Sequence, residues 1–369
     1  MAGVNYSINV ASGNTLIYGG RFGQPSLIAN LQPGYWIEAP NTNMSAVYEP
    51  IETRLAGDPA TVMTAWSGGA WDVANKRLWV FGGGHLDYKG NENYAFDAVT
   101  LTWQRIRNSS LDYTNCSEFA ADGAPAATHS YNGLLYVPNI QKVMKFGGGS
   151  YGSSCPSYLH LLTQDTVSGA WVEYNDMTSP NGSHHQAAIA YDSATGLVWR
   201  EPGFIGGPFL FETWNPITDV WTTQRTNLSG LDWDSGSAID PDRRLFVIVG
   251  GNQNYMRVWD LDSPSTPPTS PTTSGPTTIE TTSGPGFIFD PVVKKFVGWA
   301  GGTGIYVLDP VTWTWTFHAA DAGNTVTPST FTPNGVYGRF FYDPDWDVYG
   351  VVNSTTTNVF FFRRPSTVT

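Results

Sequence analysis

The sequence predicts an all-β protein built from a repeated unit of four short strands. The chain has 369 residues, of which 14% are aromatic and only 14% are charged, and it is rich in Gly (40) and Pro (25). Aromatic residues favour strands, whereas Gly and Pro mark turns. A motif typical of two strands around a short turn also recurs along the chain, and such periodicity indicates a repeat architecture.

The repeat has two halves. The first is an apolar run, a turn that often contains Asp-Pro, and a second apolar run that ends in glycines, as in SAIDPDRRLFVIVGG at 237–251. The second half, such as IYVLDPVTWTW at 305–315, adds a strand, a tight turn and a strand containing Trp. The first half occurs six times, with turn positions 48 to 66 residues apart at Asp72, Pro138, Asp192, Asp240, Asp290 and Asp343.

Four strands, A to D, in about fifty residues match one blade of a β-propeller. The glycine stop after strand B and the Trp of strand D resemble those of kelch-type propellers, in the galactose-oxidase/kelch-like superfamily, over roughly residues 36–364. The fourth unit departs from this pattern because it lacks the strand-D Trp. The resemblance implies a propeller fold but not a function, because propellers host many activities.

We therefore predict a single propeller over residues 34–366. Its six blades are expected at about 66–107, 129–174, 185–225, 234–282, 283–320 and 335–364. The last unit lacks strand D, so we expect GYWIEAP at 34–40 to pair with NVFFFRR at 358–364 and close the ring, leaving no open sheet edge.

Two segments fit the repeat less well. Residues 1–33 are interpreted as an N-terminal extension with a β-hairpin, and a seven-bladed ring, the alternative, would need its extra blade from residues 1–60. The Pro/Thr-rich stretch 262–286 has the composition of a linker. It falls where blade four needs strand D, so we expect a loose strand near 277–282.

Charge and cysteine content exclude several classes. The net charge of −12, with only six Lys, argues against nucleic acid and anionic membranes as partners. No apolar run reaches membrane length, and the first residues do not resemble a signal peptide. We expect an extracellular or virion-associated protein. Cys116 and Cys155 fall in loops on one face of blade two, where a disulfide and two free thiols are both open outcomes.

Strand direction predicts where a site lies. The A–B turns are short, and the long B–C and D–A connections share the opposite face, which we call the looped face. We expect a binding site there, near the mouth of the central channel. The candidate binding residues are His85, Asp87, Tyr88, Asn91, His129, His185, Trp233, Tyr255, Arg257, Tyr337 and Arg339. The alternative is structural: turn residues bonding local backbone, and arginines pairing with carboxylates between blades.

Three functions are compatible with these residues. The first is a non-enzymatic structural or interaction propeller that recognises a glycan, a protein surface or copies of itself. The second is a lyase acting on a uronate-containing polysaccharide, with His85, His129, Tyr191 and Arg200 as catalytic candidates. The third is a metal-dependent oxidase or hydrolase, which is disfavoured because no HxH or HExxH spacing occurs. We expect no cofactor and no metal.

Overall fold

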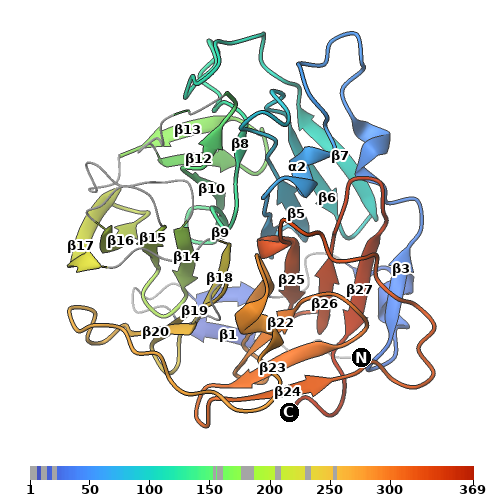
Figure 1. The fold of residues 1–369 in the computed structure, drawn as a ribbon. Coiled ribbons are helices and arrows are strands. Elements are labelled where there is room, and N and C mark those ends of the chain that lie inside the picture. Colours follow the sequence, from blue (N-terminus) through green and yellow to red (C-terminus); the bar gives the residue numbers. More distant parts are fainter. Residues whose placement is uncertain are drawn as a thin grey trace.

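The structure is a computed structural model of a six-bladed β-propeller (Figure 1). The sheets lie around a central axis, and each is antiparallel. The structure describes residues 6–9, 15–18, 23–152, 155, 161–175, 187–203, 209–228, 234–251 and 256–369. Among these, β1 (Tyr6–Asn9) and β2 (Thr15–Tyr18) pair with each other in a separate two-stranded sheet.

Each blade runs from strand A beside the axis to strand D at the rim, and the order along the chain is the order around the ring. Blades one to three contain β4 (Ala70–Asp72), β5 (Arg77–Val80), β6 (Asn93–Asp97) and β7 (Thr102–Arg107); β9 (Leu134–Val137), β10 (Lys142–Phe146), β12 (Leu161–Asp165) and β13 (Trp171–Tyr174); β14 (Ala187–Asp192), β15 (Leu197–Pro202), β16 (Phe209–Asn215) and β17 (Val220–Leu228). Blades four to six contain β18 (Ser235–Asp240), β19 (Leu245–Gly250) and β20 (Met256–Asp260); β21 (Gly286–Asp290), β22 (Lys295–Trp299), β23 (Ile305–Asp309) and β24 (Thr314–His318); β25 (Phe340–Asp343), β26 (Val348–Val351), β27 (Val359–Arg363) and β3 (Trp36–Ala39).

The ring closes as the sequence predicts. Strand β3 forms the outer strand of blade six and pairs antiparallel with β27, with Trp36 opposite Phe362. In Figure 1 the blue β3 lies beside the red β27, so the two ends of the ring share one sheet. The helix α1 (Ser26–Ala29) is also attached here, because the Arg363 guanidinium donates to the carbonyls of Ile28 at 2.7 Å and Leu31 at 3.2 Å.

Blade four differs from the expectation. The predicted strand D at 277–282 is wrong, because η2 (Thr278–Thr281) is a 3₁₀ helix there. The ladder next to β20 is reduced to one bridge, in which Val258 and Thr269 exchange backbone bonds of 2.8 and 2.9 Å. The prolines around Thr269 carry no N–H to donate, which prevents a longer ladder.

The core is divided among the six junctions between blades. Successive side chains of a strand point to opposite faces of its sheet. Accordingly, Val359 and Phe361 of β27 pack against blade one, whereas Phe360 and Phe362 pack against blade five. The other four junctions have equivalent apolar clusters, so every blade contributes to two cores.

Buried aspartates organise the A–B turns. Strand A ends in an aspartate without exposed surface in five blades, at Asp72, Asp192, Asp240, Asp290 and Asp343. Each carboxylate accepts amide bonds from its own turn, as Asp192 does from Ala194 at 3.0 Å. This turn chemistry explains why Asp recurs at this position of the repeat.

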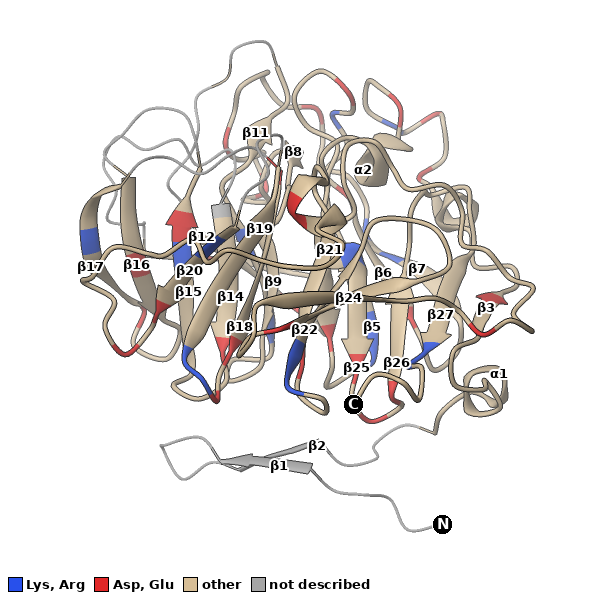
Figure 2. Cartoon of the chain, turned by 60° about the horizontal axis from the view of Figure 1, so that its bottom comes forward, with Lys and Arg blue, Asp and Glu red and all other residues tan. Residues whose placement is uncertain are grey.

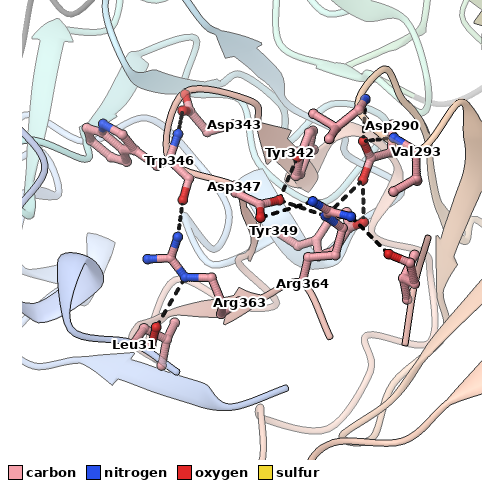
Figure 3. A network of polar contacts seen from close by, with 12 residues as sticks. Leu31, Asp290, Val293, Tyr342, Asp343, Trp346, Asp347, Tyr349, Arg363 and Arg364 are labelled. Carbon is pink, nitrogen blue, oxygen red and sulfur yellow. Dashed lines mark hydrogen bonds and ion pairs between the residues drawn. The ribbon is translucent and has the colours of Figure 1, made fainter. Parts of the chain in front are cut away.

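The same aspartates connect neighbouring blades. Asp343 of blade six accepts a bond from the Lys76 ammonium of blade one at 2.8 Å. Asp290 of blade five accepts one from the Tyr349 hydroxyl of blade six at 2.7 Å (Figure 3). In Figure 2 the red and blue segments of the ribbon mark acidic and basic residues along this turn side of the ring. Three of the remaining junctions are bridged by Asn139 to the Gly196 carbonyl, Arg244 to Asp192 and Lys294 to Asp242.

Replacing Trp36 tests the closure. This side chain is 3% exposed, stacks on Phe362 at 4.6 Å and donates its Nε1–H to the Thr303 carbonyl at 2.8 Å. Trp36→Ala should lower the free energy of unfolding by about 3–5 kcal/mol in urea titrations, because it removes a large buried aromatic ring. The control Ile217→Ala, at a side chain 66% exposed, should change it by less than about 0.5 kcal/mol. Equal losses in both variants would contradict the closure.

Candidate binding site on the looped face

Side chains of blades one and two meet on the looped face. His129 Nε2 lies 2.6 Å from Asp87 Oδ2. The centroid of the His129 ring lies 5.5 Å from that of His85, 5.2 Å from that of Trp66 and 5.9 Å from that of Tyr131. We call these five residues the histidine cluster. It unites three predicted candidates, His85, Asp87 and His129, with two aromatic residues.

The glycine-rich loops of the two blades interlock to hold this cluster. Strand β8 (Thr128–His129) pairs with β11 (Gly149–Ser150), and the His85 amide donates to the Gly149 carbonyl at 3.2 Å. Gly84 has a φ of +61°, and a Cβ there would lie 2.3 Å from the carbonyl carbon of Thr128. Only glycine allows this close approach, so the glycine stop of the repeat also positions His85.

A disulfide bond connects the same loops, which is one of the two outcomes that the sequence left open. Cys116 and Cys155 are bonded, with their Cα atoms 4.9 Å apart. The Cys116 amide donates to the Tyr151 carbonyl at 2.8 Å, and the amide of Gly152 donates to the His85 carbonyl. The disulfide therefore supports the loop that holds His85.

The backbone is strained at the cluster. Trp66, His85 and Tyr131 have φ values of +47°, +46° and +46°, and Tyr337 nearby has +47°. Bulky residues rarely adopt this left-handed conformation, and such strain gathers at functional sites. Trp66, Tyr131 and Tyr337 each lie shortly before strand A of their blade, where the connection from the rim turns down toward the axis. The Tyr131 amide bonds the Trp66 carbonyl at 2.6 Å and so links two of these turns.

Exposure separates contact residues from supporting ones. His85 is exposed, the Asp87 side chain is 37% exposed and Trp66 is partly buried. His129, whose side chain is 3% exposed, and Tyr131 are buried. The buried His129 therefore holds Asp87 in place. The accessible residues His85, Asp87 and Trp66 offer an imidazole, a carboxylate and an indole to a ligand. That set can stack on an apolar ring face and accept hydrogen bonds from hydroxyl groups.

Polar side chains cross the channel next to this cluster. The Tyr337 hydroxyl of blade six donates to Asp234 Oδ1 before blade four at 2.9 Å. The Asn132 amide of blade two donates to the Ser237 hydroxyl of blade four at 2.7 Å. These blades are not neighbours in the ring, so the bonds span the axis. The candidate site accordingly lies on the looped face beside the axis, between blades one and two.

Arg339, one of the candidate binding residues, has a structural role. It has no exposed surface, and its five N–H groups donate to five backbone carbonyls. These carbonyls belong to Met63, Ser67, Gly335, Val352 and Asn353. Burial lowers the pKa of Arg339 to about 9, which leaves it charged at neutral pH.

The other predicted arginines pair with carboxylates. Arg257 of blade four bonds the buried Glu201 of blade three, as the inter-blade alternative predicts, and Arg200 bonds the buried Glu212 within its own blade. Burial lowers the pKa of both arginines to about 10. Tyr191 lies beside the A–B turn of blade three, at the end of the blade away from the looped face. The four lyase candidates are therefore not brought together, although His85 and His129 are.

The remaining candidates fall into two groups. Tyr88, Asn91 and Tyr337 are buried, and their side chains bond other parts of the protein; Asn91, for example, donates to Ser110 and to the Pro125 carbonyl. These three match the structural alternative. His185, Trp233 and Tyr255 lie outside the described residues.

Sequence reasoning missed Trp66 and Tyr131 as site residues, and Asp234 as the partner of Tyr337 across the axis. Trp66 lies just before the first repeat, where no periodic pattern draws attention to it. Tyr131 and Asp234 lie in connections that we assigned to the looped face without singling them out. The signal that identifies them is a left-handed backbone, which a single sequence does not reveal for residues other than glycine.

Glu92 is a buried acid beneath the cluster loop. It is 1% exposed, and its Oε1 accepts bonds from the hydroxyls of Tyr88 at 2.5 Å and Tyr94 at 3.4 Å. Within the described part of the chain, its Oε2 has no hydrogen-bond partner. Burial is the main cause that raises the pKa of Glu92.

The raised pKa predicts a pH effect. Stability that depends on neutral Glu92 is present at low pH and is lost as pH rises through its folded-state pKa. The free energy of unfolding of Glu92→Gln, relative to that of the unmodified protein, should therefore increase as the pH rises from about 5 to about 8. Urea unfolding at the two pH values measures this difference. The exposed control Glu52→Gln should show no such trend. A difference in stability that is the same at both pH values for Glu92→Gln would refute the buried-acid assignment.

Other signatures of function are limited. Among the residues that the structure describes, no group of three or more His, Cys, Asp or Glu is placed to hold a metal ion. In the same part of the chain, no helix has the length and apolar character needed to span a membrane. Comparison with protein-family models and with curated proteins found no match.

Proposed function

We propose that this protein is a non-enzymatic binding propeller of the kelch type that recognises a glycan through the histidine cluster. The observation that carries the proposal is the accessible trio of His85, Asp87 and Trp66, two of which have strained backbone. An indole beside a carboxylate and an imidazole suits a sugar ring, which offers an apolar face and several hydroxyl groups.

The fold supports a binding role in a second way. Most of the predicted polar candidates that are described serve the architecture, and the exposed ones are gathered at one point of the looped face. Loops on a rigid scaffold are common places for recognition. We place the protein outside the cell or on a virion surface, where a disulfide is stable and glycans are abundant.

The test is binding to a glycan array, with protein variants checked for folding by circular dichroism. His85→Ala and Trp66→Ala should each weaken binding by about tenfold or more, since contacts of this kind contribute at least 1.4 kcal/mol when central to a site. The matched control Phe317→Ala, at an aromatic side chain 47% exposed on β24, should bind as the unmodified protein does. Absence of glycan binding, with self-association in light scattering, would replace this proposal with self-assembly.

A lyase is the second candidate, favoured by the 2.6 Å contact between His129 and Asp87 next to His85. A histidine hydrogen-bonded to a carboxylate is an arrangement suited to proton transfer. The reaction would remove the proton from the carbon that bears the uronate carboxyl group, form a double bond to the next carbon and break that carbon's bond to the glycosidic oxygen. This oxygen takes up a proton as the neighbouring sugar leaves. Ultraviolet absorbance from an unsaturated product, lost in His129→Ala, would establish this activity, and its absence across uronate polymers would exclude it.

A further inference from the structure

We infer that the glycan recognised by the histidine cluster is uncharged rather than uronate-containing or sulfated. This inference rests on the proposed function and specifies the ligand class of the same site. Two independent observations carry it: the charge of the cluster itself, and the engagement of the basic side chains around it.

The cluster contains one carboxylate and neither lysine nor arginine. The Asp87 carboxylate is its accessible charged group, and His129 engages one of its oxygens. An anionic sugar would approach this carboxylate with no lysine or arginine of the cluster beside it, and like charges repel. A hydroxyl group, in contrast, can donate to the carboxylate.

The nearest lysine along the chain is already neutralised. Lys89 is buried, and its Nζ lies 2.5 Å from Asp112 Oδ1. The same ammonium lies over the rings of Tyr113 and Tyr151, at 5.1 and 5.9 Å from their centroids. It therefore belongs to the packing under the loop and is not presented to a ligand.

Other basic groups toward the looped face are engaged as well. Lys145 is buried and donates to the Gly147 carbonyl at 2.8 Å, and Arg107 bonds Asp122. Arg257 and Arg339 are held by Glu201 and by five carbonyls. The segments between 153 and 255 that lie outside the described residues contain neither Lys nor Arg.

These observations set the ligand class. Proteins that select carboxylate or sulfate groups usually present a free guanidinium, whose paired N–H groups match the two oxygens. The basic side chains named above already bond acceptors of the protein, and none of them belongs to the histidine cluster, so an acidic glycan at the cluster would meet no lysine or arginine there. An uncharged ring needs only the indole of Trp66 and the acceptors of Asp87.

The test compares matched polymers. Binding of the full chain is measured with polygalacturonate, with the same polymer after reduction of its carboxyl groups, with dextran and dextran sulfate, with chitosan, and with a panel of neutral plant, algal and bacterial polysaccharides. We expect binding confined to neutral members, with similar affinity at about 20 mM and about 500 mM salt, because screening acts only on charged contacts. Trp66→Ala should lower it about tenfold or more and Phe317→Ala should not.

The outcomes separate the two proposals. Binding restricted to uronate, sulfated or cationic polymers, and weakened by salt, would overturn the inference while leaving glycan recognition in place. Binding to a neutral polymer that is unchanged in Trp66→Ala would also overturn it, because the ligand would then lie elsewhere. Binding to no polymer of any class would overturn both the inference and the proposed function.

Discussion

The arrangement of this ring depends most on the hydrogen bonds between the buried guanidinium of Arg339 and five backbone carbonyls. A ring of blades must join its last unit to its first, and here one buried cation bonds carbonyls on both sides of that junction. Met63 and Ser67 precede blade one, whereas Gly335, Val352 and Asn353 belong to blade six. Because no carboxylate is among its hydrogen-bond partners, five carbonyl dipoles take the place of water around the charge.

The same residue connects architecture with the candidate site. Ser67, whose carbonyl accepts from Arg339, follows Trp66, whose own carbonyl accepts from Tyr131. The closing cation thus fixes one wall of the histidine cluster. On the opposite side of the ring, the buried aspartates and their partners hold the short A–B turns together, which leaves the long connections to build the looped face. The side with the A–B turns holds the blades together, and the looped face is free to bind a ligand.

The sequence was sufficient for the fold because its signals are local and repeated. Asp at the end of strand A and glycine after strand B are each required by a turn, so each recurs in five of the six blades. The missing strand D of the last unit identified β3 as its replacement. The outer strand of blade four was predicted at the wrong place, because the Pro/Thr segment there departs from the repeat. The site was only partly predictable. Topology placed His85, Asp87 and His129 on one face, but the burial of Arg339 and the strain at Trp66 arise from contacts between distant segments.

The most direct measurement of this account is the free energy of unfolding of Arg339→Lys. A lysine ammonium has three N–H donors, so at least two of the five carbonyls would lose their partner, and each such buried group costs about 1–3 kcal/mol. The account predicts a loss of about 2–6 kcal/mol, while Arg243→Lys, at a partly exposed side chain that bonds Asp240, should lose less than about 1 kcal/mol. An Arg339→Lys protein as stable as the unmodified one would contradict the claim that this buried cation holds the ring closed.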